Sequence, residues 1–334
     1  MSQRILGHRF FPLLVTLSLF LVAWSIGASQ YDGFGSARVF FNLFTDNAFI
    51  AVTAIGMTFV ILSGGIDLSV GSVIALTGVA IAVLVEQMQW HPLQAFVLVL
   101  VGGALFGAMM GALIHFYRLQ PFIVTLAGMF FARGLATTLS ENSIPIVHPF
   151  YGKVSDFGFG LPGGGSIGSQ TLVLLVVLIA AIVAAHYTSF GNNVYAIGGD
   201  YDSAGLMGVP VGATTIAIYT LSSTMAALAG ILFSFYTFSG YALTGIGLEL
   251  DAIAAVVIGG TLITGGRGYV AGTLIGVLIT GVIQTYISFN GTLNSWWTKI
   301  VIGILLLFFI GLQRVLTSFR GSRGSTAADL AAHS

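Results

Sequence analysis

The sequence predicts an all-α protein that crosses a membrane many times. Of its 334 residues, 56% are hydrophobic and only 7% are charged, whereas soluble domains carry roughly 25% charge. Because this number of charged residues is too small for a surface exposed to water, most outer residues are expected to face lipid. The 45 glycines agree, because small residues let membrane helices approach closely. We predict a polytopic membrane protein of about ten transmembrane helices.

The composition also argues against several kinds of site. The absence of cysteine excludes disulfides, iron–sulfur ligation and thiol chemistry. The six histidines are far apart in sequence, and we find no metal-ligand, serine-hydrolase or phosphate-loop motif. A formal net charge of zero gives no reason to expect a nucleic-acid partner. We therefore expect a protein that is not an enzyme, with no catalytic residues, metal or cofactor of its own.

The predicted crossings are apolar stretches of about 20 residues, the length that a bilayer requires. The first could instead be a signal peptide, because Arg4 and Arg9 precede it and small residues around Ala28 follow; we favour an uncleaved helix. Residues 1–315 then form one membrane domain, and 316–334 a cytoplasmic tail that we expect to be disordered. The ten stretches are 10–28, 45–63, 69–86, 93–115, 121–140, 169–187, 213–237, 249–264, 269–288 and 296–313.

Basic residues predict the orientation, because Lys and Arg accumulate in short cytoplasmic loops. With ten crossings, Arg38, Lys153 and Lys299 lie on one side of the membrane and seven arginines on the other. Both termini are therefore predicted to be cytoplasmic, with the long loop 141–169 outside and the loop 188–212 inside. The seven are Arg4, Arg9, Arg118, Arg267, Arg314, Arg320 and Arg323.

Two segments match without gaps at an offset of 201 residues and share the pattern GG-x5-G-[ST]. Gly64 and Gly65 begin the pattern in the first copy, and Gly265 and Gly266 in the second. A Gly-Gly pair lets the backbone leave helical geometry, and repeats with discontinuous helices line the substrate path of many transporters. The alternative is a tight cytoplasmic turn without a transport role. Six predicted helices separate the copies, which favours a parallel repeat, although an error of one helix would make it inverted.

Four ionisable residues fall within or beside predicted crossings, where charge is costly and often functional. Asp67 lies in the first glycine junction and Arg133 lies inside the fifth crossing, while Glu249 and Asp251 begin the eighth. We expect Arg133 to have a structural role and a carboxylate partner, either Glu249 or Glu141. Glu249 and Asp251 could instead be solvated caps of a helix. These four residues and the four junction glycines are our candidates for the translocation path or gate.

The inner loop contains a short predicted helix. Asp200 occupies the cap position and Asp202 the first turn. Ala204 and Met207 are three residues apart and would share one face, and Gly208 would end the helix. With Ala and Met pointing outward, this helix could fill a groove on a partner. The alternative is a simple connecting loop.

This loop carries a resemblance to a known family. The stretch Tyr195-Ala-Ile-Gly-Gly-Asp, followed by Ala204 and Leu206-Met-Gly, resembles the coupling segment of ribose-type sugar permeases, the membrane subunits of ABC importers. Residues 56–72, 121–129 and 249–260 also resemble that family, and the resemblance extends from about residue 10 to residue 315. Asp200 stands where many members have Asn, a change that should keep the capping role.

Within the family, the chain is most similar to the second permease subunit of galactofuranose importers, through Thr45-Asp-Asn-Ala and Ser140-Glu-Asn-Ser-Ile-Pro-Ile. The resemblance implies a bacterial inner-membrane location, a second permease subunit, a periplasmic sugar-binding protein and a cytoplasmic ATPase that binds the ATP. It also implies a set of residues that carry ATPase motion to the gate: Tyr195, Ala196, Ile197, Gly198, Gly199, Asp200, Ala204, Met207 and Gly208.

We interpret the chain as a permease subunit for import of galactofuranose or a related monosaccharide. One alternative is a self-sufficient secondary sugar transporter, which would need no ATPase contact. Another is a branched-chain amino-acid permease subunit of the same superfamily, with a different substrate and the same machinery. An intramembrane enzyme is a third, and it lacks any nucleophile–base pattern.

Overall fold

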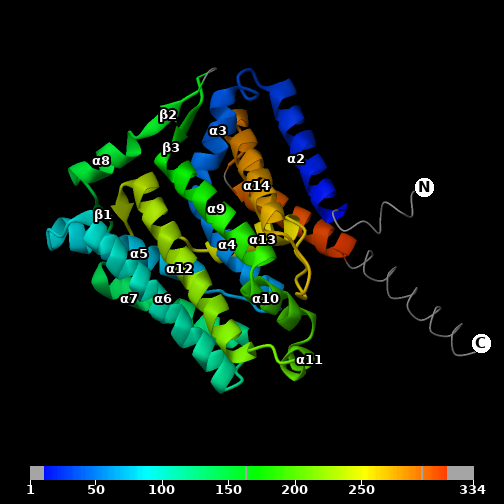
Figure 1. Ribbon diagram of the computed structural model, residues 1–334. Coiled ribbons are helices and arrows are strands. Elements are labelled where there is room, and N and C mark those ends of the chain that lie inside the picture. The colour runs from blue at the N-terminus through cyan, green and yellow to red at the C-terminus, as the bar shows by residue number, and fades with distance from the viewer. Residues whose placement is uncertain (1–10, 162–163, 295, 314–334) are drawn as a thin grey trace, which may run out of the picture.

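The structure, a computed structural model, describes residues 11–161, 164–294 and 296–313, and it is mainly helical, with four short strands (Figure 1). Among these residues, eight helices are long enough and apolar enough to span a membrane. This confirms the predicted all-α membrane fold. The eight are α2 (Phe11–Gln30), α5 (Val70–Ala82) continued by the π-helical turn η1 (Val83–Gln87), α6 (Pro92–Phe116), α7 (Pro121–Leu139), α9 (Ser169–Tyr187), α12 (Val211–Thr237), α14 (Val270–Asn290) and the helix Trp296–Gln313.

The two remaining predicted crossings fall on interrupted helices. Residues 45–63 cover the end of α3 (Ala37–Asp46) and all of α4 (Ala48–Leu62), which meet at a 54° bend. Residues 249–264 cover α13 (Leu248–Ile258), which has only 11 residues. At 1.5 Å per residue α13 is about 16 Å long, against a hydrocarbon core of about 30 Å. The expected continuous helix over 249–264 is therefore wrong, because a turn with Gly260 at φ +91° ends α13 early.

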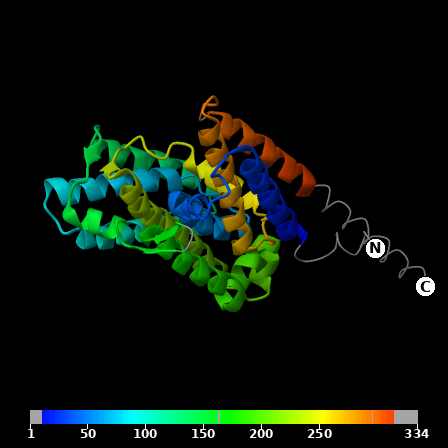
Figure 2. The same cartoon turned by 90° about the horizontal axis from the view of Figure 1, so that it is seen from above.

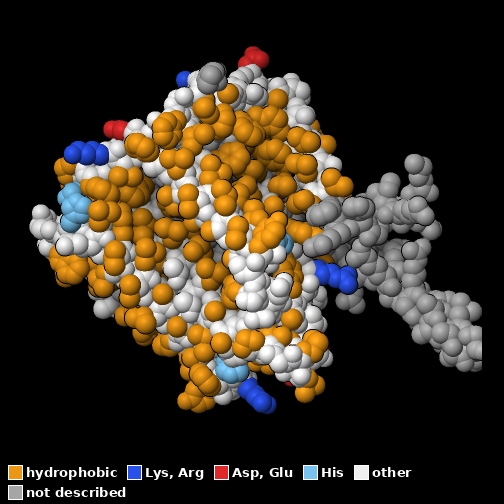
Figure 3. All heavy atoms as spheres, viewed as in Figure 1, with side chains coloured by type: hydrophobic (Ala, Val, Ile, Leu, Met, Phe, Trp, Pro, Cys, Tyr) orange, Lys and Arg blue, Asp and Glu red, His pale blue; other side chains and the backbone are white. Residues whose placement is uncertain are grey.

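The core of the molecule is built around α4 and α12. Fourteen of the 15 residues of α4 are buried, as expected for a helix that is apolar on all sides and enclosed by others. Figure 2 shows α4 between two groups of helices, with α5–α7 at one end of the molecule and α2, α14 and the last helix at the other. Hydrophobic side chains cover most of the face seen in Figure 3, and charged ones lie near its edges. Such a surface suits lipid.

The two long loops form small structures at opposite ends of the bundle (Figure 1). One end holds α8 (Pro149–Ser155) and two antiparallel strand pairs, β1 (Ile144–Pro145) with β4 (Ser239–Gly240) and β2 (Gly158–Gly160) with β3 (Ser166–Gly168). The other end holds α10 (Ser189–Gly199) and α11 (Tyr201–Leu206). We call the first end the α8 end and the second the α10 end.

Both ends of the described chain lie at the α10 end. The Thr16 hydroxyl near the start of α2 donates to the Ile258 carbonyl, 2.9 Å away, and the Gln313 amide donates to the Thr261 carbonyl, 3.2 Å away. Ile258 is the last residue of α13, so α2 begins and the last helix finishes beside it. In the described part of the chain, eight helices can span a membrane, or nine segments if α3 and α4 form one bent span, and the shorter α13 also ends at the α10 end.

Candidate coupling and translocation site

Two interruptions of the helices lie against each other at the α10 end. The first break, residues 63–69, separates α4 from α5, and the second break, residues 259–269, separates α13 from α14. The Gly266 amide donates to the Leu62 carbonyl at 2.8 Å, so the end of α4, where the first break begins, is hydrogen-bonded to the second break. Since α4 and α13 both run toward this contact, the two copies of the repeat have the same direction, as the spacing of six helices predicts.

The junction glycines have the geometry that the repeat predicts. Gly64, Gly265 and Gly266 have φ values of +80°, +86° and +73°, a region that side chains strongly disfavour. A methyl group on Gly265 would also lie only 2.8 Å from the Gly64 nitrogen. Gly65 has no positive φ, but it packs against the hydroxyl of Tyr219, which leaves no room for a side chain. The glycines therefore permit both the break and the close contact.

Asp67 joins the first break to α12. Its carboxyl group is fully buried; one oxygen accepts hydrogen bonds from the Ser69 amide at 2.9 Å and the Ser69 hydroxyl at 2.6 Å, and the other from the Ser222 hydroxyl at 2.7 Å. Tyr219, one turn earlier on α12, has a buried hydroxyl without a hydrogen-bond partner among the described residues. Sequence reasoning missed Tyr219 and Ser222, although their spacing of three within an apolar crossing was a signal.

Arg133 is held by backbone carbonyl groups. Its guanidinium donates to the carbonyl oxygens of Ala242 at 2.6 Å and Thr244 at 2.5 Å, in the segment between α12 and α13. The expected ion pair with Glu249 or Glu141 is wrong: among the described residues Arg133 forms no salt bridge, although Glu249 lies close enough to interact electrostatically. A non-helical segment leaves carbonyl groups without partners, and a guanidinium supplies several donors in one plane.

Glu249 and Asp251 lie in the first turn of α13, as their capping interpretation predicts. A Glu249 oxygen accepts from the Gly247 amide at 3.2 Å, and the carboxylate also packs against Gly71 of α5. Asp251 forms a salt bridge with Lys299, near the start of the last helix. Both carboxylates therefore have partners within the protein.

The inner loop is more ordered than the sequence predicts. Residues 189–199 form α10, which was expected to be loop, and α11 follows with Asp200 as its cap. The Ser203 amide donates to Asp200 at 2.7 Å. Hydrogen bonds from the Ser203 side chain and amide lower the pKa of the Asp200 carboxyl. Gly208, with φ +85°, directly follows the helix cap, so the predicted helix and its end are confirmed.

The outward face of α11 differs from the expected one. Ala204 is completely buried, against Ile197 and Val211, whereas Met207 is 73% exposed and Leu206 is 91% exposed. The expectation that Ala204 points outward together with Met207 is wrong, because the alanine packs α11 onto α10 and α12. Leu206 and Met207 form the exposed apolar tip of α11.

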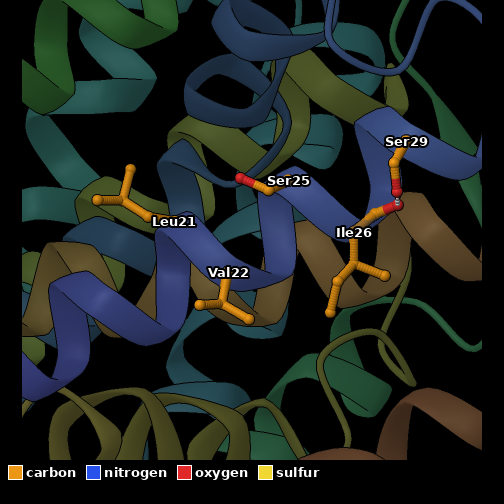
Figure 4. A pocket seen from close by; sticks show the side chains of 5 residues that line it. All are labelled: Leu21, Val22, Ser25, Ile26 and Ser29. Carbon is orange, nitrogen blue, oxygen red and sulfur yellow. Dashed lines mark hydrogen bonds between the residues drawn. The ribbon is translucent and has the colours of Figure 1, made fainter.

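A surface groove lies on α2, lined by Leu21, Val22, Ser25, Ile26 and Ser29. Figure 4 shows these five side chains on one helix, with the Ser29 hydroxyl bonded to the Ile26 carbonyl. The lining contains no charged group and touches neither break. We therefore place the candidate site at the breaks and at α10–α11.

Comparison with known proteins shows the family of the chain. A model of the family described as "Branched-chain amino acid transport system / permease component" matches residues 39–310, a range that includes both breaks and α10–α11. The chain belongs to this permease family. No solved structure matches the chain.

Curated relatives of this permease component cover nearly its whole length. It is 56% identical to the inner membrane ABC transporter permease protein YjfF of Escherichia coli K12 over 95% of this chain and 96% of that protein. It is 36% identical to the fructose import permease protein FruG of Bifidobacterium longum, over 95% of each chain. It is also 36% identical to the ribose import permease protein RbsC of Escherichia coli K12, over 92% of this chain and 97% of that one.

Proposed function

We propose that this chain is the membrane-spanning permease subunit of an ATP-driven sugar importer in a bacterial inner membrane. The observation that carries the proposal is the exposed apolar tip of α11, formed by Leu206 and Met207, at the same end as the two breaks. A cytoplasmic ATPase would bind this tip, and a second permease subunit would complete the path. Both ends of the described chain lie at the α10 end, which supports termini on one side of the membrane. We propose that this side is the cytoplasm, as the basic residues predict, and that α8 and the strand pairs face a periplasmic sugar-binding protein.

The charges near the breaks favour a neutral solute. The Asp67 carboxyl accepts three hydrogen bonds from Ser69 and Ser222, and Arg133 is bound to two carbonyl groups. Because Asp67 is fully buried, its carboxylate is not exposed to bind the ammonium group of an amino acid. The relatives named for ribose and fructose point the same way. Within the sugars, we propose galactofuranose or a related monosaccharide, on the resemblance in residues 45–48 and 140–146.

Two other functions remain to be separated by experiment. The first is a branched-chain amino-acid permease subunit, because the description of the matching family model names those amino acids. Such a permease would take up leucine. A secondary sugar transporter would need no ATPase, and the exposed tip of α11 argues against it, because an apolar tip at the bundle's end suits a protein partner.

Transport by the reconstituted complex tests the proposal. The chain, its second permease subunit, the ATPase and the binding protein are placed in proteoliposomes, and uptake of radiolabelled D-galactose, D-ribose, D-fructose and L-leucine is measured with ATP or ADP. We expect ATP-dependent uptake of D-galactose above that of the other three solutes. Uptake of leucine alone, or sugar uptake that is equal with ADP, would contradict the proposal.

A further inference from the structure

Gly198, near the end of α10, packs against the two backbone atoms whose hydrogen bond joins the end of α4 to the second break. A methyl group on Gly198 would overlap the Leu62 carbonyl oxygen and lie 2.5 Å from the Gly266 nitrogen, the two atoms of that bond. Methyl groups on Gly265 or Gly266 would in turn lie 3.0 Å from the Gly198 carbonyl oxygen. Three backbone segments from distant parts of the chain thus meet where no side chain fits.

A second contact fixes α10 to the second break. The Tyr195 hydroxyl, one turn before Gly198, donates to the Gly268 carbonyl at 2.8 Å. Together, Tyr195 and Gly198 hold α10 against residues 265–268, while Gly198 also touches the end of α4.

The connection from α10 to the exposed tip of α11 is short and packed. Asp200 ends α10, with its amide bonded to the Ala196 carbonyl, and begins α11 by accepting from Ser203. Ala204 is buried against Ile197 of α10. A displacement of Leu206 and Met207 would therefore reach Gly198 through packed helices and not through a loose loop.

We propose that Gly198 is the positioning residue through which α10 and α11 move both breaks together. This inference rests on the proposed function, since it requires an ATPase that moves α11. Movement of α10 would displace the end of α4 at Leu62 and the second break at Gly266 and Gly268 at once, through the packing of Gly198 and the hydrogen bond of Tyr195. The two copies of the repeat then change conformation as a pair.

Gly198→Ala tests this role, because it adds one methyl group at the contact and is otherwise compatible with a helix. Gly102→Ala on α6 is the matched control, since a methyl group there meets no atom within 4 Å. ATP hydrolysis and D-galactose uptake are measured per assembled complex in proteoliposomes. For Gly198→Ala we expect hydrolysis within about twofold of wild type and uptake at least about tenfold lower, with Gly102→Ala like wild type.

A second readout follows the break itself. The chain has no cysteine, so Thr264→Cys, exposed in the second break, provides its single thiol for maleimide labelling. We expect its labelling rate to change at least about threefold when vanadate traps nucleotide on the ATPase, and this change to disappear when Gly198→Ala is added.

The outcomes separate the inference from the proposed function. Wild-type uptake in Gly198→Ala, a proportional loss of hydrolysis and uptake, or retained labelling changes would overturn the role of Gly198. If Gly198→Ala does not assemble, Tyr195→Phe decides: uptake per ATP about threefold lower supports the inference, and an unchanged ratio overturns it. Absence of ATP-dependent uptake by the wild-type complex would instead contradict the proposed function.

Discussion

At the scale of single residues, Arg133 shows how a charge is accommodated within the bundle. Its guanidinium binds the carbonyl groups of Ala242 and Thr244, which belong to the non-helical segment between α12 and α13. That segment needs an internal source of hydrogen-bond donors, because lipid provides none. Arg133 therefore fixes the entry into α13, and through α13 the second break.

Removing this side chain should lower stability. Hydrogen bonds to a charged group contribute about 2 kcal/mol each, so we expect Arg133→Ala to reduce folded yield and to lower the melting temperature in detergent by several degrees. The melting temperature of Arg133→Lys should lie between those of wild type and Arg133→Ala, since an ammonium keeps the charge but lacks the planar fork of a guanidinium. Lys153→Ala, exposed on α8, is the control. An unchanged melting temperature in Arg133→Ala would show that the two bonds contribute nothing.

The cap of α11 provides a prediction about pH. Bonds from Ser203 lower the pKa of the Asp200 carboxyl, so the stability from the cap is complete above its ordinary value of 3.8 and is lost only as pH falls through the lowered value. Asp200 should therefore add no pH dependence to coupling between about pH 5 and pH 8. Asp200→Asn should keep uptake because Asn also caps helices, whereas Asp200→Ala should reduce uptake per ATP. Equal uptake per ATP in Asp200→Ala and wild type would contradict the need for the cap.

At the scale of helices, the two breaks depend on backbone that approaches too closely for side chains. Gly265 combines a positive φ with contact to Gly64, whereas Gly291 has φ +67° and a methyl group there would meet no atom within 4 Å. Alanine substitutions at Gly265 and Gly291 therefore separate the effect of backbone strain from the effect of lost contact between the breaks.

We therefore expect Gly265→Ala to reduce uptake at least about tenfold, because it both strains the turn and pushes the breaks apart. Gly291→Ala should cost only the strain of the left-handed conformation, about 1 kcal/mol, and should keep most uptake. Uptake measured per folded complex decides this. Equal losses in the two variants would mean that strain alone, and not contact between the breaks, determines transport.

The sequence predicts those structural features that are caused by residues close together in the chain, and not those caused by distant contacts. Long apolar stretches predicted most of the helices, the Gly-Gly pairs predicted the breaks, and Asp200 predicted a cap. The helix α10 was missed because its glycines disfavour helix by about 1 kcal/mol each, while its stability comes from distant contacts of Gly198 and Tyr195. The carbonyl partners of Arg133 could not be predicted either, since a carbonyl without a partner leaves no mark in the sequence.

At the scale of the whole molecule, the fold separates two ends with different surfaces. The α10 end carries both breaks, both ends of the described chain and the exposed tip of α11. The α8 end carries the two strand pairs and an exposed Val147, 77% accessible. A permease driven from the cytoplasm requires the ATPase at the first of these ends only.

Cross-linking from single cysteines tests this claim most directly. Because the chain has no cysteine, Met207→Cys and Val147→Cys each place one thiol at opposite ends of an otherwise unreactive subunit. A short bismaleimide is added to the assembled importer, and the products are identified by mass spectrometry. We predict a cross-link from Met207→Cys to the ATPase and none from Val147→Cys. A cross-link to the ATPase from Val147→Cys, with none from Met207→Cys, would contradict the account.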